Sequence, residues 1–178
     1  MKLYLDMDGV LADFDSTYFH KDFDVYGDVK TKDRIRFRQA VLHGKLFEQL
    51  AMMPHALKLL DVVRDLYTRG LEVEILSSVG SSEIRHSKEA ATQKTNWLLK
   101  HNIKYPRNFV TSFAEKAKYA THDSILIDDR PDCIKYFTSA GGYGILHVDS
   151  KVDESIVKLR KRFAELEYHE YLLSKQKS

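Results

Sequence analysis

Short apolar runs alternate with longer segments of helical periodicity over most of the chain. The apolar runs predict strands over residues 2–6, 71–76, 108–110, 124–128 and 143–148. The segments between them predict helices over residues 54–69, 81–101 and 131–141, and a last helix after residue 150. Strands that alternate with helices in this way predict an α/β fold, in which a parallel sheet carries helices on both faces.

The helix expected over residues 54–69 has clear signals at both ends. Pro54 suits a first helical turn, and Gly70 suits the residue just beyond the last turn. Apolar residues at steps of three predict its buried stripe, which comprises Leu57, Leu60, Val63 and Leu66.

Residues 14–53 interrupt the alternation of strands and helices. The segment holds several aromatic residues, Phe14 and Phe47 among them, and a charged stretch of helical character over residues 32–43. A connection this long is uncommon in a compact domain unless it has a function. We expect a small helical cap over the carboxyl edge of the sheet, where α/β proteins bind ligands. The expected domains are a core of residues 1–13 and 54–150, the cap of residues 14–53, and a C-terminal helix with a polar tail over residues 151–178.

Two pairs of aspartates follow predicted strands. Asp6 and Asp8 end the first apolar run, and Asp128 and Asp129 end the run over residues 124–128. In a parallel sheet these ends share one crevice, where two like charges about 4 Å apart repel by roughly 4 kcal/mol at an effective dielectric of 20. A bound cation would offset that repulsion, and ligands that are all oxygen favour Mg²⁺ before Ca²⁺ or Mn²⁺. The alternative, two unrelated acidic turns or helix caps, explains one pair but not both.

Further polar residues are expected at the same edge. Ser77 and Ser78 follow the strand over residues 71–76, where a hydroxyl and the start of the next helix favour an anion. Lys116 and Lys118 precede the strand over residues 124–128, and a metal and phosphate site needs a cation on the far side of the phosphate. Taken singly, these residues would be ordinary loop and surface residues.

The composition of the chain sets broader limits. Its 178 residues suit one domain with an insertion, and 43% of them are hydrophobic. The net charge of +2 argues against a bulk nucleic-acid binder, and the single cysteine, Cys133, fits a reducing compartment. Asp6 and Asp8 break the apolar region that a signal peptide needs, and no apolar stretch approaches the roughly 20 residues of a membrane span. We therefore expect a cytoplasmic protein that does not enter membranes.

The motifs resemble those of the haloacid dehalogenase superfamily of aspartate-nucleophile phosphotransferases, which has a Rossmann-like core. Residues 6–10 match its first motif, Ser77 its hydroxyl motif, Lys118 or Lys116 its lysine motif, and residues 128–129 its acidic motif. Residues 6–14 and 125–131 are similar to the 5'(3')-deoxyribonucleotidase group in particular. One difference is that no lysine follows Ser77 until Lys88, whereas that group has one nearby.

The resemblance implies a mechanism. Asp6 would attack phosphorus to give an aspartyl-phosphate, and Asp8 would act as acid and then base. The implied Mg²⁺ ligands are Asp6, the Asp8 carbonyl, and Asp128 or Asp129. Ser77 and Lys118 would hold the phosphate. Lys118 is preferred to Lys116 because it lies ten residues before Asp128, the offset expected of the nucleotidase group.

Substrate contacts are also implied. Phe14 and Phe47 would stack on or wall in a nucleobase or sugar, the alternative being packing inside the cap, and Ser77, Ser78 and Lys118 would contact the phosphate. The expected partner is a small phosphomonoester, in the first place a (deoxy)ribonucleoside monophosphate. A sugar phosphate, a 3'-phosphorylated nucleic-acid end, a phosphomutase reaction and a non-catalytic binding role are the rivals, and a homodimer is left open.

Overall fold

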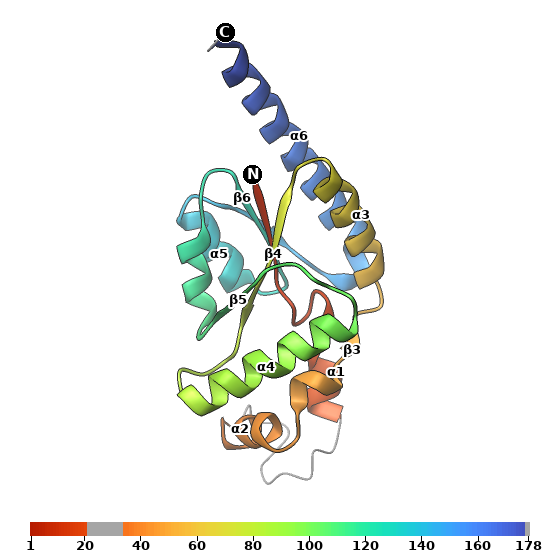
Figure 1. Ribbon diagram of the computed structural model, residues 1–178, viewed down its shortest axis with the longest axis vertical. Helices are drawn as coiled ribbons and strands as arrows, with labels where there is room; N and C mark the ends of the chain where they lie inside the picture. Colours follow the sequence, from red (N-terminus) through yellow and green to blue (C-terminus); the bar gives the residue numbers. More distant parts are fainter. Residues whose placement is uncertain (21–33, 177–178) are drawn as a thin grey trace.

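The computed structural model describes residues 1–20 and 34–176, and these contain one five-stranded sheet at the centre of the molecule (Figure 1). The strand order is β5-β4-β1-β6-β7, and every neighbouring pair is parallel. The strands are β1 (Lys2–Leu5), β4 (Glu72–Ser78), β5 (Arg107–Val110), β6 (Ser124–Asp128) and β7 (Tyr143–Leu146). The predicted α/β class and the predicted parallel sheet are confirmed.

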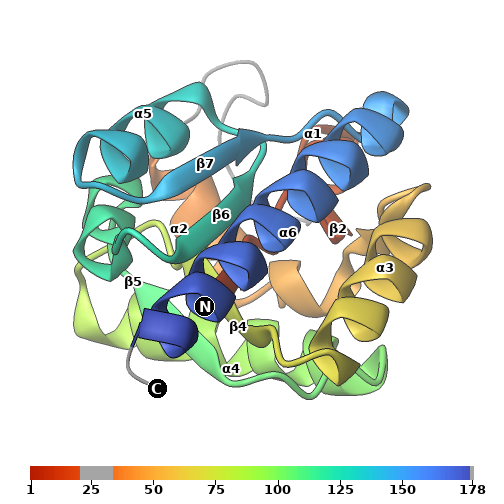
Figure 2. The ribbon, with the colours of Figure 1, turned by 90° about the horizontal axis from the view of Figure 1, so that it is seen from above.

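Helices cover both faces of this sheet. They are α3 (Ala56–Thr68), α4 (Ile84–Lys100), α5 (Pro131–Ser139) and α6 (Val152–Gln176), with the 3-10 helices η2 (Phe113–Tyr119) and η3 (Asp149–Lys151). Seen from above, α3 and α6 lie on one side of the sheet and α5 on the other (Figure 2). Within residues 1–20 and 34–176, no helix is long and apolar enough to cross a membrane.

Strand β1 shows how the sequence builds the two faces. Successive side chains of a strand point to opposite sides. Leu3 and Leu5 therefore join the larger core beneath α3, α4 and α6, whereas Tyr4 packs with Cys133 and Phe137 of α5. Both sides of β1 are apolar because the strand is central, as expected for a parallel sheet.

The predicted stripe of α3 is wrong at one end. Leu57 is 58% exposed, and Leu59 is buried in its place. A helix advances about 100° per residue, so a series with steps of three drifts around the surface, and Leu57 lies on the side opposite to Leu66. The buried face follows mixed steps of three and four instead, and comprises Ala56, Leu59, Leu60, Val63 and Leu66.

The described part of residues 14–53 is mostly helical and lies beyond the carboxyl edge of the sheet (Figure 1). It contains α1 (Phe14–His20), α2 (Arg34–Leu42) and η1 (Leu46–Gln49). A small antiparallel pair, which no pattern predicted, joins its two ends: β2 (Ala12–Asp13) with β3 (Ala51–Met52). Residues 21–33 of the expected cap and residues 177–178 of the expected tail lie outside the described residues. The division into core, cap and C-terminal helix stays a prediction.

Candidate functional site

The turn after β1 places the first aspartate pair. The Met7 carbonyl accepts hydrogen bonds from the amides of Leu11 and Ala12, which close the turn. Gly9 adopts a φ of 72°, and a Cβ there would lie 2.2 Å from Oδ2 of Asp129. Glycine is therefore required both for the backbone conformation and for the close approach of the two loops.

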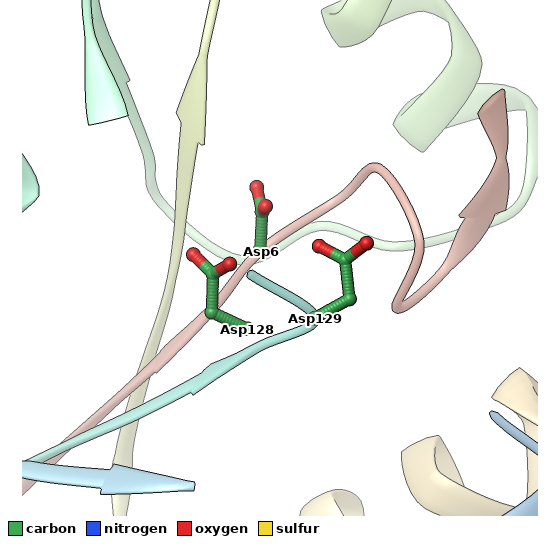
Figure 3. Close-up of side chains that lie close together, drawn as sticks. All are labelled: Asp6, Asp128 and Asp129. Carbon is green, nitrogen blue, oxygen red and sulfur yellow. The ribbon is translucent and has the colours of Figure 1, made fainter. Parts of the chain in front are cut away.

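Three carboxylates meet where β1 and β6 end (Figure 3). One oxygen from each of Asp6, Asp128 and Asp129 lies within 4.8 Å of the others, so the three residues could hold a metal ion. The register explains the meeting, because Leu5 is paired with Ile127, so that Asp6 follows β1 at the level where Asp128 ends β6. The predicted convergence of the two aspartate pairs is thus observed for these three residues.

Asp8, the fourth aspartate, turns its side chain toward a different partner. Its Oδ2 accepts a hydrogen bond of 2.7 Å from Nζ of Lys94 in α4, and its Oδ1 is buried with no hydrogen-bond partner among the described residues. Lys94 also donates to Oγ of Ser77 at the end of β4, at 3.1 Å. Asp8 and Ser77 are therefore joined through one buried lysine.

Lys94 was not among the predicted site residues, although Lys94 and Trp97 lie where the 5'(3')-deoxyribonucleotidase group often has a lysine and a tryptophan. A signal for it exists, because it belongs to the buried stripe of α4 with Ala90, Gln93 and Trp97. A lysine at such a position is almost never found buried unless it is paired. Helical spacing could have predicted that Lys94 is buried, but it could not have identified the carboxylate with which Lys94 pairs.

Lys116, not Lys118, is the lysine that the structure brings to the carboxylates. Its Nζ lies 2.9 Å from Oδ2 of Asp6 and 2.6 Å from Oδ2 of Asp128, and the side chain is buried. Lys118 is exposed and pairs with Glu115 at 2.9 Å. The preference for Lys118 is corrected. Both lysines belong to η2, where about 120° separates successive residues, so side chains two positions apart cannot point to the same place.

Three carboxylates of the site, those of Asp8, Asp128 and Asp129, have raised pKa values. The Asp129 side chain reaches the surface, but the protein around it removes part of the solvent from its carboxylate. This desolvation, followed by the charges of Asp6, Asp128 and Asp8, raises the pKa of Asp129 to about 7. Burial also raises the pKa of Asp8 and of Asp128, with the charge of Asp6 adding to the effect. Burial opposes the charge of Lys116, but attraction to Asp6 and Asp128 outweighs it and raises the pKa of this lysine.

The charge of the site suits a divalent cation. If all four aspartates of the site were ionised, they would carry four negative charges. The ammonium groups of Lys94 and Lys116 offset two of these, which leaves a net charge of −2. The ligand atoms that remain are carboxylate oxygens, and Asp129 is exposed, so an ion could reach them. A hard divalent ion such as Mg²⁺ fits this set.

The remaining predicted residues lie nearby but differ in access. Oγ of Ser78 accepts a hydrogen bond of 3.1 Å from the amide of Gly80. Phe14 is partly buried, 5.3 Å from Tyr18 and 6.1 Å from Phe47 between ring centroids. Phe47 is only 1% exposed, and Nζ of Lys94 lies 4.2 Å from the centroid of its ring. Phe47 therefore packs inside the protein as the alternative interpretation expected, and offers no open face to a substrate.

A cavity of about 590 Å³ opens at the same edge of the sheet. Its walls come from α2, from residues 80–83 after β4, from His86 of α4 and from residues 111–112 after β5. The charged side chains there are Arg34, Arg38 and Glu83, of which Arg38 and Glu83 pair at 2.8 Å. A second cavity, of about 310 Å³, lies at the amino end of β5 beside α3, and so at the opposite edge from the carboxylates.

Comparison with known proteins supports the fold. No protein-family model and no curated protein matches the chain. Among solved structures, a hydrolase from Streptococcus pneumoniae TIGR4 is similar, with 17% identity and a TM-score of 0.51. The match covers 90% of this chain and 96% of that chain. The two proteins therefore share an α/β architecture over almost their whole length.

Proposed function

We propose that the protein is a Mg²⁺-dependent phosphatase of the haloacid dehalogenase type, which hydrolyses nucleoside monophosphates through an aspartyl-phosphate on Asp6. One observation carries this proposal: the Asp6 carboxylate lies at the end of a central strand, between a buried lysine and two further aspartates. The similar hydrolase from Streptococcus pneumoniae supports a hydrolytic reaction on this architecture.

Asp6 is held as a nucleophile should be. Its Oδ1 accepts a hydrogen bond of 2.8 Å from the amide of Met7, and its Oδ2 contacts Lys116. Both contacts restrict rotation of the carboxylate, which keeps one oxygen aimed at an incoming phosphorus. Attack forms the Asp6–phosphorus bond as the ester bond to the leaving oxygen breaks.

Asp8 is suited to move the proton in both halves of the reaction. Its raised pKa favours a protonated acid that can give the proton to the leaving oxygen. The resulting carboxylate then takes a proton from the water that attacks the aspartyl-phosphate, which returns both groups to their first state. The unpartnered Oδ1 is the atom available for this transfer.

The other residues would bind the phosphate and the metal. Ser77 and Lys116 would contact the phosphoryl oxygens, because Lys116 contacts Asp6 and Asp128 directly and Ser77 is joined to Asp8 through Lys94. Asp6, Asp128 or Asp129, and the carbonyl of Asp8 would hold Mg²⁺. When bound there, the ion supplies positive charge that offsets the charge of the phosphoryl group.

The nucleotide as substrate is supported by the resemblance of residues 6–14 and 125–131. A cavity lies at the same edge of the sheet as the carboxylate cluster, but it is lined by none of the residues of that cluster. A volume of about 590 Å³ lies in the usual range of small-molecule sites, roughly 300–1,000 Å³. Arg34 and Arg38 against Glu83, which pairs with Arg38, leave one net positive charge in its walls to attract an anionic ligand. Phe14, partly buried, would lie on the cap side of the base or sugar.

Release of inorganic phosphate from a substrate panel tests the proposal. With Mg²⁺ present, we expect dUMP or dTMP to be hydrolysed with a higher kcat/KM than a sugar phosphate or a 3'-phosphorylated oligonucleotide. Hydrolysis of either of the latter in preference would keep the reaction and overturn the substrate. Transfer of phosphate to a second sugar without free phosphate would indicate a mutase instead.

Binding of Mg²⁺ should strengthen as the pH rises through about 7. Asp129 has a pKa of about 7 in the metal-free protein, so below that pH a proton competes with the ion. The apparent Kd should therefore fall by at most about tenfold per pH unit below 7 and level off above it, since binding releases the proton. Calorimetry at pH 6, 7 and 8 in buffers of different ionisation enthalpy would measure both the apparent Kd and the number of protons released on binding. A Kd independent of pH over this range would contradict the assignment of Asp129 as a ligand.

A further inference from the structure

Lys94 lies at a junction between the sheet, the catalytic turn and the cap segment. It is fully buried in the middle of α4, and its ammonium group has three neighbours. These are Oδ2 of Asp8 at 2.7 Å, Oγ of Ser77 at 3.1 Å and the ring of Phe47 at 4.2 Å. Each comes from a different element: the turn after β1, the end of β4, and η1.

These neighbours leave little of the ammonium group for a substrate. A lysine has three N–H donors. Two are directed at Asp8 and Ser77, and the side facing η1 is covered by the aromatic face of Phe47, a favourable contact for a cation. Lys116, by contrast, contacts Asp6 and Asp128, two carboxylates of the candidate metal site, directly.

The contacts on either side of Lys94 join α4 firmly to the cap segment. Gln93 donates to the Val41 carbonyl at 2.7 Å and accepts from the Phe47 amide at 3.2 Å. Trp97 donates from Nε1 to the Leu50 carbonyl at 2.8 Å. Any shift of η1 would therefore be transmitted to the helix that carries Lys94.

We propose that Lys94 is a positioning residue, which holds Oδ2 of Asp8 so that Oδ1 faces the leaving oxygen and which ties this placement to the cap segment through Phe47. Oδ1 is the carboxylate oxygen with no partner among the described residues, so it is the oxygen that can give and receive the proton. The inference rests on the proposed phosphatase reaction and concerns the step in which the leaving group is protonated.

The variant Lys94→Met tests this role, because it keeps an unbranched side chain of similar length but removes the charge. Its activity is compared on two phosphate esters that differ in leaving group, dUMP and p-nitrophenyl phosphate. p-Nitrophenolate leaves without needing a proton, whereas the alkoxide of dUMP does need one. A misplaced general acid should lower kcat/KM for dUMP by about 10²-fold or more, and kcat/KM for p-nitrophenyl phosphate by less than about tenfold. The comparison uses kcat/KM because this constant ends with formation of the aspartyl-phosphate, whereas kcat also contains its hydrolysis, in which Asp8 acts as base for both esters. Inhibition by inorganic phosphate should stay unchanged.

Equal losses for both esters, with weaker inhibition by inorganic phosphate, would show that Lys94 binds the phosphate and would overturn the inference. Equal losses with unchanged inhibition would also overturn it. Turnover by the wild-type protein tests the proposed function separately, since only the ratio of the two losses bears on Lys94. Lys88→Met, the same change at an exposed position of α4, is the matched control and should leave both esters unaffected.

Phe47→Leu provides a second test if Lys94→Met fails to fold. It keeps Lys94 and its two hydrogen bonds, and removes only the aromatic face. We expect a smaller loss of the same kind, about three- to tenfold in kcat/KM for dUMP, with kcat/KM for p-nitrophenyl phosphate unaffected. Equal effects on both esters, or none on either, would overturn the link between the cap and Asp8.

Discussion

Replacement of Asp6 by asparagine should abolish phosphate release, with kcat lowered by at least about 10³-fold and the fold intact. An amide is close to a carboxylate in size but is a far weaker nucleophile toward phosphorus. The Asn side chain can still accept the hydrogen bond from the Met7 amide. Lys116 keeps Asp128 as its partner, and one negative charge leaves a crowded cluster, so the free energy of unfolding should not fall.

The measurement is phosphate release from dUMP with Mg²⁺, together with thermal unfolding of both proteins. Asp132→Asn, in the exposed first turn of α5, is the matched control and should retain wild-type turnover. Acid quenching during turnover should trap phosphate on the wild-type protein but not on the Asp6→Asn variant. A variant that keeps more than about a tenth of the wild-type rate would exclude Asp6 as the nucleophile. Equal inactivity of both proteins on every ester would favour the non-catalytic alternative.

The sequence predicted the meeting of Asp6 with Asp128 and Asp129 because a parallel sheet determines where its strand ends lie. Apolar runs located β1 and β6, and their carboxyl ends then had to share an edge. The fold class followed from the same alternation of strands and helices. No detail of side-chain packing was needed for either conclusion.

The lysines show where such reasoning fails. The choice between Lys116 and Lys118 depends on η2, a 3-10 helix that no hydrophobic periodicity in the sequence predicted. Lys94 depends on the docking of α4 against residues far away in sequence, and so does the burial of Phe47. These positions are set by tertiary contacts, whereas the strand ends are set by local pattern and topology.

Replacement of Lys116 by methionine should lower both activity and stability. Asp6 and Asp128 would lose the cation that now lies within 2.9 Å of each, and removing one partner of a buried ion pair costs about 3–5 kcal/mol. Loss of a cation aimed at the phosphoryl group should lower kcat by about 10²–10³-fold. Urea unfolding of the metal-free protein and phosphate release with Mg²⁺ would measure the two effects.

Lys118→Met is the matched control, because the same change two residues away breaks only an exposed pair with Glu115. Such pairs contribute about 0–1 kcal/mol, so stability and turnover should barely change.

Mg²⁺ should restore more stability to Lys116→Met than it adds to the wild-type protein, since the ion would then lie among carboxylates with less competing positive charge. If Lys118→Met lost activity while Lys116→Met kept it, the order of the two lysines would be reversed. If Mg²⁺ stabilised Lys116→Met and the wild-type protein equally, Lys116 would have no influence on the metal site, and its predicted place beside the ion would be wrong.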